Sequence, residues 1–385
     1  MQTGNPKNNF TKGGANSPDP DELTREVYGI LGIAIDPVDM AIVTNKIKRA
    51  VAKAKLLFIS TANLNFLVMG QSDPEFRESL LKSDVCTADG MPVVWLARLL
   101  GIPVRRRLAG ADIFEALKWT NVPSQPLKVF IFGGAEGIAR AACKRLNSES
   151  SGMSCVGSYY PGFTTIDEMS ADPIIDKINS CSADFLAVAL GAKKGQAWLV
   201  KNHDRLQIPV RVHLGATINF QAGALKRAPT TMQRWGVEWL WRIKEEPQLW
   251  RRYWSDGLVF LQLLLTRVLP LMAITQWSQF RAHRHDLLVE LNEDQNSINI
   301  SLNGAAVRQN IDKVLVSFQT AAAAGTKDIA INFRNTCVLD ARFLGLLIML
   351  DKQLKGRHLG LTCTELPRSI ERIFYLSGFR YLLHH

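Results

Sequence analysis

The strongest constraint on the fold is a regular alternation of apolar runs and amphipathic stretches between residues 27 and 224. Short runs rich in β-branched and aromatic residues include KLLFIST, DVCTADG, KVFIFGG, ADFLAVALGA and VRVHLGA. Longer amphipathic segments, such as PEFRESLLKSD and EGIARAACKRLNSE, separate them. Strands that alternate with helices predict an α/β core in which a mostly parallel sheet is covered by helices on both faces.

Polar or glycine-rich groups follow nearly every predicted strand. These groups are Thr61 and Asn63, Asp89 and Gly90, Gly133 and Gly134, Gly191, and Gly215. In open sheets of this class the ligand crevice lies at the carboxyl ends of the strands. The sequence therefore predicts that these residues meet on one rim.

Asp89 can be interpreted in two ways. Asp before Gly is common in turns, because Asp tolerates unusual backbone angles and bonds its own backbone. A carboxylate at a strand end that faces a crevice can also accept a proton from a hydroxyl nucleophile. Spacing alone favours the turn.

The other motifs at the rim also allow both a structural and a functional interpretation. Thr61 and Asn63, in STANLNF, suit either a helix cap or hydrogen bonds to a sugar or diphosphate. Gly133, Gly134 and Gly137 suit either a tight strand–helix turn or a phosphate at a helix N-terminus. The G-x-G-x-x-G spacing is absent, so the pattern does not indicate a nicotinamide cofactor.

Composition further limits the classes of protein to which the chain can belong. The chain has 385 residues, of which 47% are hydrophobic, enough for two domains. Its six cysteines are scattered without a C-x-x-C pair, so we expect neither zinc ligation nor a disulfide framework, and a reducing compartment. The N-terminus lacks the apolar region of a signal peptide. Residues 1–24 are predicted to form a disordered tail, and its Asp19-Pro-Asp21 is not expected to hold a metal.

Residues 226–284 are predicted to form a basic, membrane-associated appendage. Residues 226–254 contain five of the nine tryptophans, with seven Lys or Arg and three Glu. Trp combined with cations is typical of a membrane interface. The apolar segment 258–277 contains Arg267 and Pro270, which favour an interfacial, re-entrant or packed helix over a span. The net charge of +11 also permits nucleic-acid binding, but no such motif is present.

Residues 285–385 are predicted to form a separate small α/β domain. DLLVELNEDQNSINISL suggests a hairpin, and DIAINF and HLGLTCTE suggest strands. Helices are expected at NIDKVLVSFQTAAAAG, FLGLLIMLDKQLKG and SIERIFYLSGF. The sequence shows no internal repeat.

Several motifs in residues 27–253 resemble the WecG/TagA/CpsF glycosyltransferases. The likeness rests on TANLNFLVMGQSDPEFRESLLKSDVCTADGMPVVWLARLLGIPVRRRLAGADIF, FIFGGAEGIA, SYYPGF, LGAKKGQAW and HLGATINFQAGALKRAP, in this order. The resemblance implies a Rossmann-like core at residues 25–225 and an inverting, metal-independent enzyme without a cofactor. It also implies a UDP-sugar donor, carrying N-acetylmannosamine or a related sugar, and a polyprenyl-diphosphate-linked acceptor. A peripheral location at the cytoplasmic face of a bacterial inner membrane follows.

The resemblance assigns roles by position. Asp89 matches the family's general base, and Thr61 and Asn63 match a T-x-N pair near the substrate. Further substrate-binding residues are predicted from the glycine motifs and the KRAP segment: Gly133, Gly134, Gly191 and Arg227. Four arginines of the appendage are predicted to border the active site: Arg234, Arg242, Arg251 and Arg252. Which arginine offsets charge on the UDP leaving group is left open.

One motif departs from the family pattern. Most members have GAPKQE where this chain has GAKKGQ, so Gly195 stands where the family has Gln. Either Gln196 replaces that residue or the donor pocket differs, and the identity of the sugar is open.

The C-terminal region resembles a STAS domain through VLDARFLGLLIML and IERIFYLSGFRYLL. Phosphorylated members have Ser or Thr after the Asp, whereas Ala341 follows Asp340 here. We expect a docking or scaffolding domain with a protein partner, or an inert stabilising module. An alternative function for the whole chain is a non-catalytic regulator that binds nucleotide sugars and acts through this domain.

Overall fold

The computed structural model describes residues 22–120, 125–282, 286–295 and 297–383. Its largest sheet has six strands in the order β4-β3-β8-β7-β5-β6, and every neighbouring pair is parallel. The strands are β3 (Leu57–Ala62), β4 (Val85–Ala88), β5 (Leu127–Gly133), β6 (Met153–Tyr159), β7 (Phe185–Ala189) and β8 (Val210–His213). The predicted parallel α/β core is confirmed, although the sequence reading had not identified β6.

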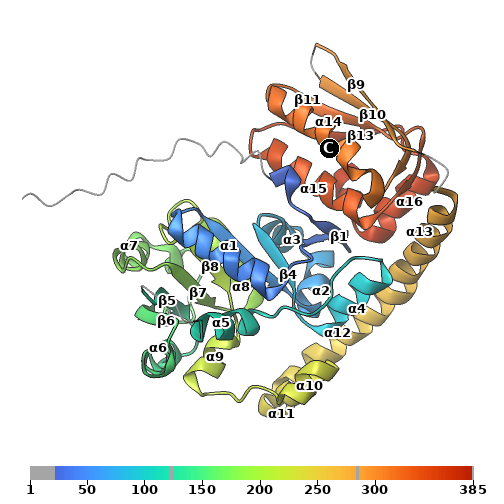
Figure 1. The fold of residues 1–385 in the computed structure, drawn as a ribbon. Coiled ribbons are helices and arrows are strands. Elements are labelled where there is room, and N and C mark those ends of the chain that lie inside the picture. The colour runs from blue at the N-terminus through green and yellow to red at the C-terminus, as the bar shows by residue number, and fades with distance from the viewer. Residues whose placement is uncertain (1–21, 121–124, 283–285, 296, 384–385) are drawn as a thin grey trace, which may run out of the picture.

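Helices cover both faces of this sheet (Figure 1). Along β5, Val129 and Ile131 pack into one core cluster, whereas Phe130 and Phe132 pack into another. The core-domain helices are α1 (Met40–Ala52), α2 (Leu64–Ser72), α3 (Pro74–Leu81), α4 (Met91–Leu99), α5 (Gly110–Lys118), α6 (Ile138–Glu149), α7 (Asp172–Ser180), α8 (Ala192–Lys201) and α9 (Thr217–Ala222), with a short 3-10 turn η2 (Glu168–Ser170). Buried apolar strands flanked by helices on both sides are the expected packing for a parallel sheet.

The N-terminal prediction needs correction at its end. Residues 1–21, including Asp19-Pro-Asp21, lie outside the described residues. Glu22–Thr24, assigned to the tail, instead form a 3-10 turn, η1, and Leu23 is 1% exposed. An antiparallel hairpin follows, made of β1 (Tyr28–Ile30) and β2 (Ile33–Ile35). These residues are ordered because they contribute apolar side chains to a core shared with the C-terminal region.

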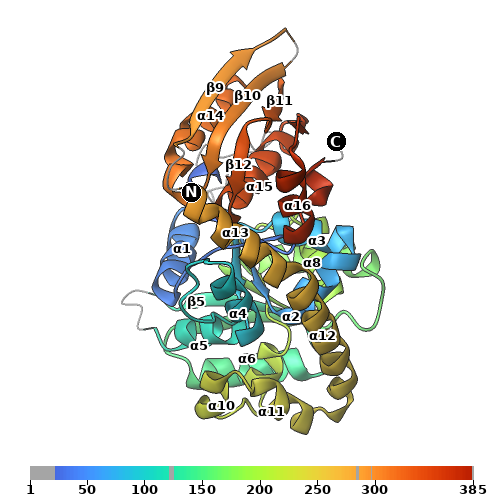
Figure 2. The same ribbon diagram turned by 90° about the vertical axis from the view of Figure 1, so that its right-hand side faces the viewer.

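The appendage forms a helical arm. It comprises α10 (Thr230–Trp235), α11 (Glu238–Glu245), η3 (Pro247–Leu249), α12 (Trp250–Leu263), η4 (Leu264–Val268) and α13 (Leu269–Ala282). Figures 1 and 2 show α12 and α13 as one long rod that runs from α10 and α11 to the C-terminal region. Pro270 does not interrupt the rod, because a π-helical turn at η4 absorbs the irregularity immediately before it.

The segment Pro247–Gln276 is long and apolar enough to cross a membrane by length and composition alone. Only 17% of the residues in its most apolar window are buried in the structure. Burial within the protein therefore does not explain why the arm is apolar.

The C-terminal region contains a second, mixed sheet. Its strands are β9 (Leu288–Glu293), β10 (Ser297–Ala306), β11 (Asp328–Asn332), β12 (Thr336–Leu339) and β13 (Leu361–Thr364), in the order β12-β10-β11-β13 with β9 antiparallel to β10. The helices are α14 (Ile311–Ala324), α15 (Ala341–Lys355) and α16 (Arg368–Ser377), with short turns η5 (Arg308–Asn310) and η6 (Arg380–Leu383). Every strand and helix predicted here is present, and β12 is additional.

The N-terminal hairpin packs directly on the C-terminal region. A Cβ at Gly345 of α15 would lie 2.0 Å from the carbonyl oxygen of Val27, so only glycine permits this approach. The backbone N–H of Gly32 donates to the carbonyl of Ser377 at 2.9 Å. Arg25, just before the hairpin, pairs with Asp36 and also approaches Met349 of α15. The two regions are thus joined by a buried interface.

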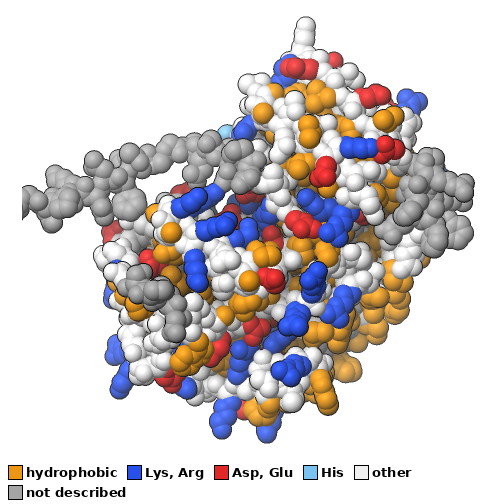
Figure 3. Space-filling view, viewed as in Figure 1, with side chains coloured by type: hydrophobic (Ala, Val, Ile, Leu, Met, Phe, Trp, Pro, Cys, Tyr) orange, Lys and Arg blue, Asp and Glu red, His pale blue; other side chains and the backbone are white. Residues whose placement is uncertain are grey.

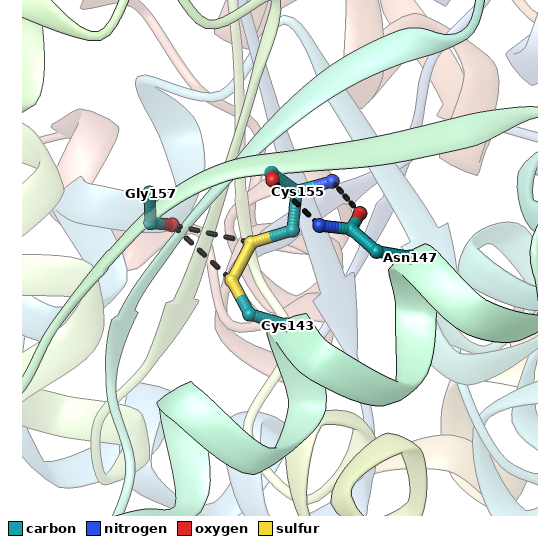
Figure 4. The surroundings of a disulfide bond; sticks show 4 residues. All are labelled: Cys143, Asn147, Cys155 and Gly157. Atoms are coloured by element: carbon teal, nitrogen blue, oxygen red, sulfur yellow. Dashed lines mark hydrogen bonds between the residues drawn. A yellow bond between two sulfur atoms is a disulfide. The ribbon is translucent and has the colours of Figure 1, made fainter.

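The structure contains one disulfide, although the scattered cysteines predict no disulfide framework. Cys143 on α6 and Cys155 on β6 form a disulfide, with Cα atoms 5.2 Å apart (Figure 4). Asn147 fixes the strand beside it, because its side chain both donates to and accepts from the backbone of Cys155. The spacing of twelve residues has no motif signature, and only the return of the chain from α6 into β6 brings the two thiols together. This is a single local crosslink rather than a framework.

Candidate active site

A cleft of about 1200 Å³ opens at the carboxyl ends of the central strands. The residues that follow β3, β4, β7 and β8 line one side, and the arm lines the other. Six predicted site residues border it, namely Thr61, Asn63, Asp89, Gly134, Gly191 and Arg227, together with Arg242 and Arg252 of the arm. The structure therefore brings most of the predicted rim into one site.

Asp89 lies between β4 and α4, with its backbone N–H donating to Ala62 of β3 at 2.8 Å. Gly90 follows with φ +98°, a conformation that favours glycine and lets the helix begin at once. Burial raises the pKa of the Asp89 carboxyl to about 7; nearby Arg107 opposes this rise, whereas Asp112 and Glu238 add to it. A carboxylate with this pKa is suited to general-base catalysis near neutral pH.

A network of charged side chains lies beside Asp89. Arg107 donates to Glu238 at 2.7 Å and to the Gln233 side chain at 3.0 Å. Asp112 on α5 pairs with Arg227 and lies 3.9 Å from Arg107. These contacts fasten α10 and α11 to the core. Sequence reasoning missed Arg107; the signal was the run of three arginines before LAGADIF.

Thr61 and Asn63 both reach the cleft, in different ways. Thr61 is 6% exposed near the end of β3. The side chain of Asn63 accepts from the N–H of Phe66 at 3.1 Å and caps α2. Asn63 thus caps a helix, as one interpretation of the sequence expected, and it borders the cleft as well.

The glycines divide into two groups. Gly134 and Gly191 line the cleft, and Gly191 stands at the N-terminus of α8. Gly133 does not line it; a Cβ there would lie 2.7 Å from the carbonyl oxygen of Ala189, at φ +100°. Gly133 is therefore needed for the close approach of β5 to β7, and its predicted place among the substrate-contacting residues is not what the structure shows.

Comparison with known proteins identifies the family. The model of the glycosyl transferase WecG/TagA/CpsF family matches residues 28–273. The chain belongs to this family.

Two similar relatives have the same name, N-acetylglucosaminyldiphosphoundecaprenol N-acetyl-beta-D-mannosaminyltransferase. The protein from Bacillus spizizenii is 29% identical over 198 residues, which are 51% of this chain and 75% of the relative. The protein from Staphylococcus aureus is 26% identical over 226 residues, which are 58% of this chain and 85% of the relative. The residues that the family model matches, 28–273, include the parallel sheet and the residues that line the cleft.

The departure from the usual WecG/TagA/CpsF motif has a structural consequence. Gln196 is 0% exposed, donates to the Ser60 hydroxyl at 3.0 Å and does not line the cleft. Gln196 thus faces Ser60 rather than the cleft. At Gly195 a Cβ would lie 2.2 Å from Cδ2 of His213, a residue that does line the cleft. The imidazole of His213 occupies space that a side chain at position 195 would need.

The arm contributes cations and aromatic rings to the WecG/TagA/CpsF site. Arg242 lies over the ring of Phe220 and pairs with Glu246. Arg234 and Arg251 are exposed and do not line the cleft, unlike their predicted position beside the active site. Arg234 lies near the end of α10, and Arg251 is the second residue of α12. Asp256 of α12, which sequence reasoning also missed, accepts from the Asn65 side chain at 3.2 Å.

The outer face of the arm is apolar. Its large exposed side chains are Trp235 (79%), Trp250 (52%), Trp254 (66%), Leu258 (53%), Leu261 (50%) and Leu265 (56%). Figure 3 shows Lys and Arg side chains beside hydrophobic ones where α4 and α12 lie. Among the described residues, no group of three or more His, Cys, Asp or Glu could hold a metal ion.

Proposed function

We propose that the protein transfers a sugar, N-acetylmannosamine or a related one, from a UDP-sugar to a polyprenyl-diphosphate-linked acceptor, with inversion and without a metal. The observation that carries this proposal is the Asp89 carboxylate, which borders the cleft with its pKa raised to about 7. Family membership and the names of the relatives support the reaction class and the lipid-linked acceptor.

The chemical step is a single displacement. Asp89 takes the proton of the acceptor hydroxyl, whose oxygen forms a bond to the anomeric carbon. The bond from that carbon to the β-phosphate oxygen breaks, and UDP leaves with the electron pair. Because attack and departure occur on opposite faces of the sugar, the product has inverted configuration.

Charge on the departing UDP must be stabilised by the protein in this mechanism. Arg227, Arg242 and Arg252 border the cleft and provide cations. Gly191 places the N-terminus of α8 at the same cleft, and a helix N-terminus favours anions. We propose that the diphosphate lies between these arginines and the N-terminus of α8.

We further propose that the arm seats the enzyme peripherally on the cytoplasmic face of the bacterial inner membrane. Exposed Trp and Leu side chains on α10–α12 would enter the lipid interface, while adjacent arginines meet anionic headgroups. Trp254, Leu258 and Leu261 also line the cleft. The saccharide of a lipid-linked acceptor could therefore enter the site while its lipid stays in the membrane.

The test is transfer from a panel of UDP-sugars to a lipid-linked N-acetylglucosaminyl diphosphate, by wild type and by Asp89→Asn. We expect one donor to support turnover by wild type and to bind both proteins. Asp176→Asn, which changes an exposed Asp on α7, serves as the control. Donor binding without turnover on any lipid acceptor would favour the alternative, a regulator that binds nucleotide sugars.

A further inference from the structure

His213 is a buried imidazole in the cleft that the proposed mechanism leaves without a role. It is the last residue of β8, is 6% exposed and borders the cleft. Its neighbours in the sheet are β3, which leads to Thr61 and Asn63, and β7, which leads to Gly191. His213 thus lies in the middle of the rim.

The hydrogen bonding of the ring determines its tautomer. Nε2 lies 2.6 Å from the carbonyl oxygen of Leu190. A carbonyl only accepts, so Nε2 carries the proton and donates it. Burial lowers the pKa of the imidazole, which keeps the ring neutral at pH 7. Nδ1 is therefore unprotonated and can act only as an acceptor.

The packing around the ring leaves Nδ1 available. The Cδ2–Nε2 edge faces Gly195, Cε1 lies on the side of Gly215, and the ring of Phe66 is tilted 6.1 Å away. Among the described residues, Nδ1 has no hydrogen-bond partner. It is not among the fully buried polar atoms without a partner, so Nδ1 is not fully buried. An acceptor nitrogen at the cleft surface is thus held in one orientation.

We propose that His213 is a specificity-determining residue that accepts a hydrogen bond from the hydroxyl or acetamido N–H of the transferred sugar. Phosphate oxygens carry no proton at neutral pH, so an acceptor nitrogen does not favour them. One strand, β3, separates β8 from the β4 strand that leads to Asp89, which is a separation of roughly 10 Å at about 4.8 Å per strand. A sugar whose anomeric carbon lies near Asp89 can reach across that interval. This inference rests on the proposed function.

The absence of a side chain at Gly195 is the second half of this arrangement. Any Cβ at that position would displace the ring, because it would lie 2.2 Å from Cδ2 and 2.8 Å from Nε2. Gly195→Ala should therefore reproduce the effect of losing the imidazole. In the His213→Ala background the same change should have little further effect, because the clash is gone.

The experiment measures transfer by wild type, His213→Ala and His213→Asn from UDP-sugars that differ only at carbon 2, namely the N-acetylmannosamine and N-acetylglucosamine epimers and UDP-glucose. We expect His213→Ala to raise the donor KM at least tenfold and to reduce the ratio of kcat/KM between donors by a similar factor. The acceptor KM should stay unchanged. His213→Asn keeps an acceptor oxygen and should restore part of the selectivity. His203→Ala, at a half-buried His outside the cleft, is the matched control.

The outcomes separate two failures. A wild-type protein that transfers from none of the donors contradicts the proposed function itself. An active wild type, together with a folded His213→Ala variant of unchanged donor KM and selectivity, overturns the role of His213 alone. Additive effects of Gly195→Ala and His213→Ala would overturn the steric link between the two positions.

Discussion

We expect Asp89 and Arg107 together to determine how the activity depends on pH. The carboxyl is an effective base only when it is ionised, and burial raises its pKa to about 7. Arg107 counteracts that rise and is itself held by Glu238 of the arm. The pKa of the Asp89 carboxyl therefore depends on a cation that a separate segment positions.

Removal of the carboxylate should abolish most turnover. Asp89→Asn preserves shape but cannot accept a proton, and a positioned base contributes roughly 10²–10⁴-fold in rate. We expect kcat to fall by that range with the donor dissociation constant nearly unchanged, as measured by radiolabel transfer and by calorimetric titration of the UDP-sugar. Turnover equal to that of wild type would refute the assignment of Asp89 as the base.

The pH profile offers a second test at this scale. In wild type, kcat/KM should rise with pH up to about 7 and level off above it, since the deprotonated form is the active one. Arg107→Gln removes the cation that lowers the Asp89 pKa, so the midpoint should move to higher pH. Arg106→Gln, an exposed neighbour that does not line the cleft, should leave the midpoint unmoved.

The same pKa shift predicts how stability changes with pH. The folded pKa of Asp89 lies above its unfolded value, so the folded state binds the proton more tightly and loses stability as pH rises from about 4 to 7. Asp89→Asn removes this loss. We expect its melting temperature to exceed that of wild type at pH 8, with a smaller difference at pH 4. Equal differences at both pH values would argue against a buried, costly carboxylate.

At the scale of the element, the arm combines two functions in one helix. Its inner side docks on the core through Asp256, Leu263 and Val268, all buried. Its outer side presents Leu258, Leu261 and Leu265, which recur at helical spacing and are about half exposed. A helix that is apolar on both sides needs an apolar environment on each of them.

Glutamate on the outer side should detach the protein from membranes without damaging the site. Burial of a large apolar side chain contributes about 2 kcal/mol, so replacing Trp235 and Leu265, neither of which lines the cleft, by Glu should greatly reduce flotation with anionic vesicles. Turnover on a short-chain, water-soluble acceptor analogue should remain. Val316→Glu, which replaces an exposed aliphatic side chain on α14, is the control. Undiminished flotation of the double variant would contradict the membrane role of this face.

For the molecule as a whole, the contact between the N-terminal hairpin and the C-terminal region matters most. The Arg25 guanidinium bonds Asp36 through two nitrogens, and Asp36 accepts from the N–H of Cys86 at 2.7 Å. Cys86 belongs to β4, the strand that leads to Asp89. Helix α15 approaches the same place through Met349 and Lys352. The C-terminal region is thereby connected to the strand that leads to Asp89.

A methyl group in this interface should destabilise the chain. In Gly345→Ala the new Cβ would lie 2.0 Å from the Val27 carbonyl oxygen, and overpacking of this kind costs about 1–3 kcal/mol. Urea unfolding should show that loss, accompanied by faster proteolysis near the hairpin. Gly356→Ala has only ordinary contacts at 3.5 Å and tests the effect of the substitution itself. Equal stability of the two variants would mean that the hairpin can be displaced at little cost.

Local sequence was a reliable guide to secondary structure and to part of the site. Alternation of apolar and amphipathic runs depends only on near neighbours, so the strands that lead to Asn63 and Asp89 could be predicted. The positions of Gln196 and Gly133 could not be predicted, because they depend on which side of a helix or strand faces Ser60 or Ala189. Arg107 was missed because its partners come from α10 and α11, more than a hundred residues away.

The sequence by itself determined that the chain forms a parallel α/β core with polar residues at its rim, a basic aromatic arm and a second α/β region. Periodicity and turn chemistry are enough for this, since they act over a few residues. Only the tertiary structure decided that the hairpin packs against α15 and that Cys143 bonds Cys155. It also decided that His213 fills the space beside Gly195. These outcomes depend on contacts within a few ångströms between distant segments, which register and packing determine and local pattern does not encode.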